Sequence, residues 1–102
     1  HTDNVAIKSY QDKGTRDIAR ASKTKESRKT LPLTLHVAAR KRLAFLNAAE
    51  SLSDLSSRRG LGLHALKKDR KGQHAISIND QYRICFVWNG EDAELVEITD
   101  YH

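Results

Sequence analysis

The chain has 102 residues, of which 30% are charged, and its formal net charge is +5. This length fits one domain with a single hydrophobic core. One cysteine excludes an internal disulfide, and no apolar run is long enough for a transmembrane helix. Because no apolar leader is visible either, we expect a soluble, cytoplasmic protein with one domain over residues 1–102, of which 1–4 are an irregular lead-in.

Charge is distributed unevenly along the chain. Residues 1–75 hold 17 Lys or Arg and 7 Asp or Glu, whereas residues 76–102 hold 1 and 6. The net charges of the two parts are therefore +10 and −5. A basic body suggests a polyanionic partner, and the acidic last quarter suggests a different role for that end.

The first third of the chain predicts little regular structure. Residues 5–10, VAIKSY, form a candidate strand, and Thr15 is a plausible N-cap for a short helix through RDIARA, residues 16–21. Residues 22–30, SKTKESRKT, are polar and have no apolar face to bury. We therefore expect this run to be a mobile linker or the frayed end of a helix.

A longer helix is expected between Pro32 and Glu50. Apolar residues recur there at helical spacing, and proline is tolerated in a first turn. These apolar residues are Leu35, Ala39, Leu43, Leu46 and Ala49. Residues 51–57, SLSDLSS, are expected to form a turn or a short helical piece.

The second half predicts an antiparallel sheet. Gly72 marks one turn, Asp80 and Gln81 join the next two strands, and Asn89 with Gly90 is a strong hairpin signal. The strand candidates are LGLHALK, HAISIN, YRICFVW and ELVEITDYH, at residues 61–67, 74–79, 82–88 and 94–102.

The register of this sheet can be partly deduced. If both hairpin loops contain an even number of residues, the two-residue side-chain period places Arg83, Asp100 and His102 on one face. A bulge at Asn89 and Gly90 would turn the side chains of the last strand to the opposite face. The other residues expected on that face are His74, Ile76, Ile78, Cys85, Val87, Val96 and Ile98.

Arg83 stands in the middle of a strand, where a guanidinium is costly to bury without an anionic partner. One interpretation is a core ion pair with Glu97 or Asp100. The other is that Arg83 faces a cleft and binds a phosphate in a forked geometry that Lys could not match.

The run LHALKKDRKG, residues 63–72, adds a cationic strand end and turn. Such a run is often a solvated edge that discourages pairing with other strands, and the alternative is a surface for RNA.

Other single residues carry weaker signals. His36 and His74 are expected to be structural or exposed, because no spacing supplies a third ligand for a metal site. Cys85, inside an apolar strand, is expected to be an inert core thiol. Phe86 and Trp88 are expected to pack in or beside the core. No metal or cofactor is expected.

Two stretches point to a family. Residues 61–102 resemble the HigB branch of the RelE-like toxins, whose members carry the pattern LxxLKGDRxGxxSIxxNxxWRIxF and finish on DYH. Residues 38–55 look like the second helix and following turn of that family. Three departures stand out: Tyr82 replaces the usual Trp, Lys68 replaces the glycine after Lys67, and His64 matches only those relatives that have a histidine there.

The resemblance implies an α/β (α+β) fold with a short N-terminal strand, two helices and then an antiparallel sheet. It also implies a toxin that cuts mRNA in the decoding site of the ribosome and that is held inactive by an antitoxin with a helix-turn-helix domain. Carried over residue by residue, the catalytic site of the family falls on His64, Lys67, Arg83, Asp100, Tyr101 and His102.

Cleavage of RNA without a metal needs a base for the 2′-hydroxyl, an acid for the leaving 5′-oxygen and positive charge at the phosphorane. We expect Lys67 and Arg83 to stabilise the phosphate and His102 with Asp100 to handle one proton transfer. His64 or Tyr101 would assist the other transfer or position the nucleotide. The cations expected to bind RNA or the ribosome are Arg40, Lys41, Arg42, Lys68, Arg70 and Lys71.

Two alternatives stay open from the sequence. One is a non-catalytic module that binds RNA or the ribosome, in accord with the net charge. The other is a protein-interaction domain whose basic patch meets an acidic partner.

Overall fold

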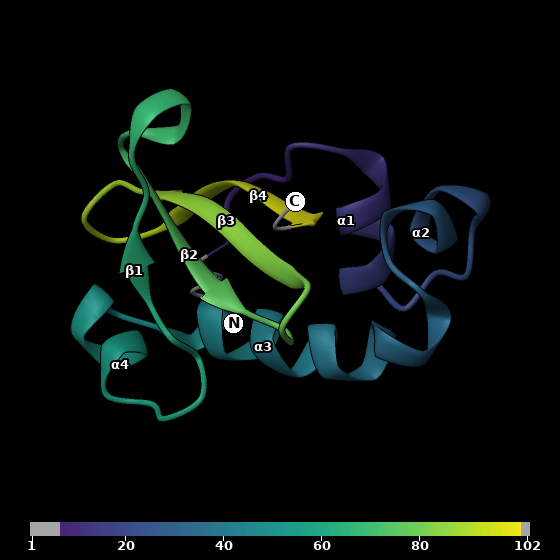
Figure 1. The fold of residues 1–102 in the computed structure, drawn as a ribbon, viewed down its shortest axis with the longest axis horizontal. Helices are drawn as coiled ribbons and strands as arrows, with labels where there is room; N and C mark the ends of the chain where they lie inside the picture. Colours follow the sequence, from purple (N-terminus) through teal and green to yellow (C-terminus); the bar gives the residue numbers. More distant parts are fainter. Residues whose placement is uncertain (1–6, 101–102) are drawn as a thin grey trace.

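The computed structural model describes residues 7–100. A four-stranded antiparallel sheet, in the order β1-β2-β3-β4, packs against helices on one face (Figure 1). This arrangement confirms the expected α+β fold class. The helices are α1 Lys13–Ala19, α2 Lys25–Thr30, α3 His36–Ala48 and α4 Leu52–Ser56, with 3₁₀ turns η1 Leu33–Leu35 and η2 Lys68–Arg70. The strands are β1 His64–Ala65, β2 Gln73–Ser77, β3 Tyr82–Trp88 and β4 Ala93–Asp100.

Helix α3 provides the main apolar layer beneath the sheet (Figure 1). Its buried side chains follow the spacing that the sequence predicts, since Ala39, Leu43 and Leu46 all lie in the core. They meet the core face of the sheet, which includes Ile84 and Phe86. Within residues 7–100 no helix is both long enough and apolar enough to cross a membrane.

The predicted N-terminal strand is reduced to two isolated parallel bridges, Ile7 with Ala93 and Tyr10 with Val96. Residues 5 and 6 of that prediction lie outside the described part of the chain. The backbone N–H groups of Lys8 and Gln11 donate to carbonyls of β4, so this segment occupies part of the free edge of the sheet.

Helix α1 begins earlier than the sequence suggested, because Asp12 rather than Thr15 is its N-cap. The Asp12 carboxylate accepts the backbone N–H of Thr15 at 2.7 Å. Thr15 itself is fully buried inside the helix. Its hydroxyl faces β4, and this tertiary contact could not be inferred from local sequence.

The prediction of a mobile linker or frayed helix end over residues 22–30 is wrong from Lys25 onward. Residues Lys25–Thr30 form α2, which starts with a reciprocal capping box between Thr24 and Ser27. Ser27 is fully buried although the helix has almost no apolar surface. Polar packing therefore orders a segment that the lack of an apolar face had suggested would be free.

The predicted register of the sheet is also wrong. Ser77 pairs with Arg83, so five residues, 78–82, separate these two paired positions, an odd number where an even one was assumed. The Asn79 carboxamide shapes this loop by accepting the backbone N–H groups of Gln81 and Tyr82. As a consequence, His74, Ile76 and Ile78 do not share the face of Arg83 and Cys85.

A bulge shifts the pairing of the last two strands. Cys85 pairs with Glu97 but Val87 pairs with Glu94, so β4 has one extra residue there. Leu95 lies in this stretch with φ 51°, in the left-handed region. The even loop length assumed from the Asn89–Gly90 turn therefore predicts the facing of the side chains only up to the bulge. Beyond the bulge, the side chains of β4 point to the opposite face from the one predicted.

Candidate functional site

The face of the sheet that points away from α3, here called the open face, brings together part of the predicted site. One row of cross-strand neighbours contains His64 and Glu97, and the next row contains Arg83. Side chains alternate along each strand, so both rows project to the same side. The first row is His64, Ala75, Cys85 and Glu97, and the second is Ser77, Arg83 and Thr99.

His64 and Arg83 lie two strands apart on adjacent rows. Ideal sheet spacings place their Cα atoms roughly 12 Å apart, which lets two long side chains converge on one phosphodiester. His64 is exposed and Arg83 is half-buried. The floor between them consists of small residues, which include Ala75 and Cys85. Both of these residues are fully buried.

Gly62 lies beside this floor and was not identified from the sequence. It lies beside Ser77 with φ +60°, and a Cβ added there would be 3.4 Å from the Ser77 hydroxyl. The signal present in the sequence is the pair Gly60 and Gly62, which on pattern alone marks only a break between elements.

The geometry of His64 indicates which tautomer it holds when neutral. Its Nδ1 lies 3.0 Å from the carbonyl oxygen of Gly62. A carbonyl only accepts, so Nδ1 carries the proton and Nε2 keeps a lone pair. His64 is therefore prepared to accept a proton at Nε2, which is the property that a general base needs.

The tip between β1 and β2 carries the predicted cationic run. Lys67, Lys68 and Lys71 are exposed there. Lys68 has φ 57°, so it adopts the left-handed conformation that the glycine of the resembled pattern would favour. The turn is thus kept, although its residue has changed.

Arg70 differs from its neighbours, because it folds back over the open face. Its Nη1 donates to Glu97 Oε1 and to Gln73 Oε1, both at 3.0 Å. This contact ties the tip to β4 across two intervening strands. The sequence did not reveal this ion pair, because the two partners are 27 residues apart.

Asp100 lies on the other side of the sheet from Arg83. It pairs with Tyr82, whose position alternates with that of Arg83, and its Oδ2 accepts from Gln81 Nε2 at 2.9 Å. The expectation that Asp100 and Arg83 share a face is therefore wrong. Tyr101 and His102 lie outside the described residues, so their predicted roles stay predictions.

Residues 6–102 match the family model described as the RelE-like toxin of the type II toxin-antitoxin system HigB. The chain belongs to this HigB-like toxin family. The match covers nearly the whole sequence and confirms the resemblance seen in residues 38–55 and 61–102. Membership implies an antitoxin as the partner of this toxin. No curated protein matches the chain.

Three predicted RNA-binding residues of this HigB-like toxin lie on α3, beneath the sheet rather than on its open face. Lys41 is exposed, and Arg40 is partly so. Arg42 donates from Nε to the Ser77 carbonyl at 3.0 Å and from Nη1 to the Ala38 carbonyl at 3.2 Å. Arg42 thus joins α3 to the end of β2, and its predicted contact with RNA stays untested.

The histidines and apolar residues that were expected to be structural differ in how deeply they are buried and in what they contact. His36 is buried, with Nε2 2.8 Å from the Leu31 carbonyl. His74 is half-buried and stacks on Phe86 with ring centroids 6.1 Å apart. Phe86 is a core residue, and Trp88 packs against the core. Cys85 is a free thiol and is buried, as expected, while its predicted inertness stays a prediction.

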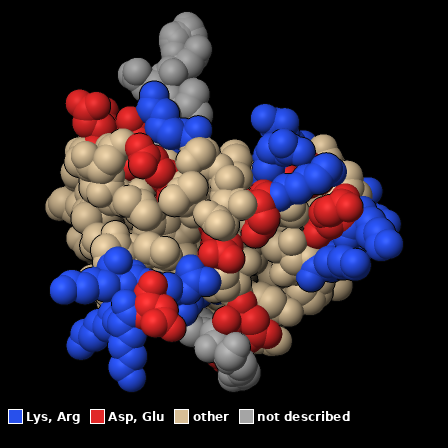
Figure 2. Space-filling model, turned by 90° about the horizontal axis from the view of Figure 1, so that it is seen from above, with Lys and Arg blue, Asp and Glu red and all other residues tan. Residues whose placement is uncertain are grey.

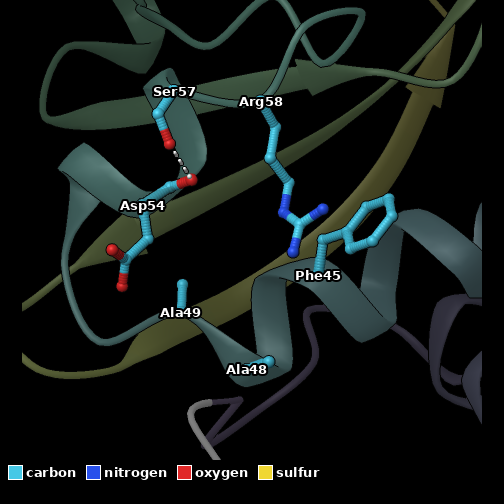
Figure 3. Close-up of a pocket in the computed structure, with 6 residues that line it drawn as sticks. All are labelled: Phe45, Ala48, Ala49, Asp54, Ser57 and Arg58. Carbon is cyan, nitrogen blue, oxygen red and sulfur yellow. Dashed lines mark hydrogen bonds between the residues drawn. The ribbon is translucent and has the colours of Figure 1, made fainter.

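A shallow pocket of about 250 Å³ lies between the end of α3 and α4 (Figure 3). The Arg58 guanidinium stands 4.1 Å from the centre of the Phe45 ring at its edge. The other lining residues are Ala48, Ala49, Asp54 and Ser57. None of the predicted site residues contributes to it, so the open face is the better candidate for the chemistry of this toxin. Over residues 7–100, no three His, Cys, Asp or Glu side chains are grouped as metal ligands.

Proposed function

We propose that this HigB-like toxin is a ribosome-dependent, metal-independent endoribonuclease that cuts mRNA in the decoding site and so inhibits translation. The single observation that carries the proposal is that His64 and Arg83 lie on the same open face of the sheet, on adjacent rows, in a chain of the HigB-like toxin family. The reaction class is attack of the 2′-hydroxyl on the adjacent phosphodiester.

In this proposal, two of the three requirements of the reaction fall to described residues. Arg83 offers a planar, permanently charged guanidinium for the non-bridging oxygens of the phosphorane. Lys67, exposed at the tip, would add a second charge. The Nε2 of His64 is oriented by the bond of Nδ1 to Gly62 and can take the 2′-hydroxyl proton.

Protonation of the leaving 5′-oxygen is assigned to the end of the chain. We place this role on His102, with Tyr101 helping to position the nucleotide. Asp100 acts indirectly, because its carboxylate is bonded to Gln81 on the other side of the sheet from Arg83. The pH dependence of cleavage by variants that lack each imidazole tests this division, in which His64 is the base and His102 the acid.

The ribosome supplies alignment that a shallow, exposed site lacks. Holding substrate in a reactive geometry is worth up to about 7–11 kcal/mol in favourable cases. The proposed partners are the ribosome, mRNA and a helix-turn-helix antitoxin, all met in the cytoplasm.

The chemistry of the products tests this proposal. Ribosomes programmed with mRNA should yield fragments that end in a 2′,3′-cyclic phosphate, since the 2′-oxygen is the nucleophile. A single 2′-deoxy substitution at the cut nucleotide should abolish cleavage at that position. Fragments with a 3′-hydroxyl and a 5′-phosphate would overturn the mechanism, because water would then be the nucleophile.

A control variant separates the active site from the fold. His64→Gln removes the base and should lower cleavage by about 10² to 10⁴, the range of one proton-transfer group. Lys8→Gln, which removes an exposed cation 3.9 Å from Asp92, should cleave normally. Arrest of translation by wild-type toxin without any cut would favour the non-catalytic binding module.

A further inference from the structure

The excess positive charge of this protein resides in one short segment. Residues 13–30, which contain α1 and α2 and are here called the helical platform, hold 7 Lys or Arg and 2 Asp or Glu. The net charge of the platform is therefore +5, the same as that of the entire chain. The remaining residues contain 11 of each sign and are neutral as a set.

Both acidic residues of the platform are occupied by its own cations. Lys13 Nζ lies 2.8 Å from Asp17 Oδ2 and 3.4 Å from Glu26 Oε1. Arg16 Nε lies 3.8 Å from Asp17 Oδ1. Five exposed cations are left without an ion pair to any described residue. They are Arg20, Lys23, Lys25, Arg28 and Lys29.

A network of polar contacts holds together the two short helices that carry or flank these cations. The buried Asp17 carboxylate accepts from Thr24 Oγ1 at 2.6 Å, next to the capping box that starts α2. Gly14 lets the two helices touch, since a Cβ there would meet Thr30 and the Glu26 carbonyl. These contacts keep α2 folded although it is polar and buries little apolar surface. The surface that the two helices expose carries the five cations.

The composition of the platform selects the kind of partner. The large apolar side chains that are exposed, Leu33, Val37 and Leu95, all lie outside it. Protein interfaces need apolar or aromatic anchors and are poor in Lys at their centres. The platform also has no aromatic residue on which unpaired bases could stack. A surface of cations alone fits the phosphate backbone of a duplex, which is bound through charge and shape.

We propose that the helical platform is a second RNA-binding surface, which binds the backbone of double-stranded RNA while the open face receives the single strand to be cut. The choice of RNA among polyanions rests on the proposed function. Figure 2 shows a group of Lys and Arg at the right of the face displayed, set apart from those at the left, and Figure 1 places α2 and the β1–β2 tip at opposite ends of the molecule. The two surfaces can therefore contact different RNA segments at once.

The test measures binding of the full chain to a 20-base-pair RNA duplex by fluorescence anisotropy over a range of salt concentrations. The platform variant is Lys23→Gln/Lys25→Gln/Lys29→Gln. The matched control is Lys8→Gln/Arg58→Gln/Arg59→Gln, which removes the same charge outside the platform. The platform variant should bind about tenfold more weakly or worse at 0.1 M salt, and its salt slope should fall by about 2 to 3, near 0.9 for each phosphate that is no longer neutralised. The control should stay within about twofold of wild type.

Three results would overturn the proposal. Equal losses in the two triple variants would show that binding follows net charge rather than place. An unchanged duplex affinity with a failure to bind the antitoxin would make the platform a protein interface. A loss confined to single-stranded RNA would assign it to the substrate strand. A duplex of DNA, measured in parallel, shows whether A-form geometry is recognised. Because neither ribosomes nor cleavage enter this assay, its failure leaves the proposed function standing.

Discussion

The Thr15 hydroxyl oxygen accepts the backbone N–H of Ile98 at a distance of 3.0 Å, although the two residues are 83 positions apart. Thr15 is fully buried and Ile98 nearly so. The segment from Lys8 to Gln11 pairs with β4 only as far as Val96. Thr15 therefore provides a hydrogen-bond acceptor for the edge of β4 beyond the point where backbone pairing stops.

Replacing Thr15 by valine should leave the Ile98 N–H buried without its acceptor. Valine keeps the shape of threonine, so the loss isolates the hydrogen bond. We expect the free energy of unfolding to fall by about 1–3 kcal/mol, the cost of an unsatisfied buried donor. Urea titration measures it. Thr15→Ser retains the oxygen and should lose less than Thr15→Val, and the reverse order would show that the methyl group matters more than the bond.

The sequence predicted those elements whose signal is local and apolar. The spacing of Ala39, Leu43 and Leu46 determined α3, and β3 has the predicted bounds of residues 82–88. The fold class followed from these elements and from the resemblance. Residues 22–30 were misjudged because α2 is held by buried polar contacts, whose partners are on α1 and cannot be seen in an apolar pattern.

The candidate site was predictable in its residue types but not in its arrangement. His64 and Arg83 were identified through the family pattern, yet their common face depends on an odd loop after Ser77. The length of such a loop cannot be read from the pattern of residues, because the Asn79 side chain decides how the turn closes. The Arg70–Glu97 pair and the role of Gly62 depend on the same register, so neither could be inferred beforehand.

Gly14→Ala tests the close contact between α1 and α2. An added Cβ would meet Thr30 Oγ1 and lie 2.7 Å from the Glu26 carbonyl oxygen, so the helices must separate. We expect a loss of about 1–3 kcal/mol, the usual cost of overpacking, despite the better helix propensity of alanine. Thermal melts should show a smaller deficit when Thr30→Ala is combined with it, since one of the two obstacles is then removed. An unchanged melting temperature for Gly14→Ala would contradict the close approach of the two helices.

Lys68 offers a test of backbone strain at the β1–β2 tip. Its φ of 57° is unfavourable for any residue with a Cβ, and its side chain is exposed. Lys68→Gly should therefore be more stable than Lys68→Ala by about 1 kcal/mol, since both remove the same charge and only glycine relieves the strain. Chemical denaturation of the pair decides it, and equal stabilities would mean that the tip relaxes at no cost.

Asp17 should make stability sensitive to acid. The hydrogen bonds from Lys13 and then from Thr24 lower the pKa of this carboxyl below its ordinary value. A lowered folded-state pKa means that the stabilisation is complete above the unfolded pKa of about 3.9 and is lost as the pH falls toward the folded pKa. Unfolding measured between pH 6 and 2 should show a steeper acid loss for wild type than for Asp17→Asn. Parallel curves would show that Asp17 does not contribute.

Deletion of His102 tests the catalytic role proposed for the end of the chain. If it protonates the leaving 5′-oxygen, its deletion should lower cleavage on programmed ribosomes by about 10² to 10⁴. The free energy of unfolding should change little, because the described core is complete without it.

The matched variant is Cys85→Ser, which alters a buried residue of the open face that has no proposed chemical role. It should lower the melting temperature while leaving the cleavage rate of the folded protein close to wild type. Tyr101→Phe, which keeps the ring, separates the hydroxyl from stacking. If the deletion variant cleaves normally, proton transfer must be reassigned to His64, with Lys67 and Arg83 as the charges that stabilise the phosphorane.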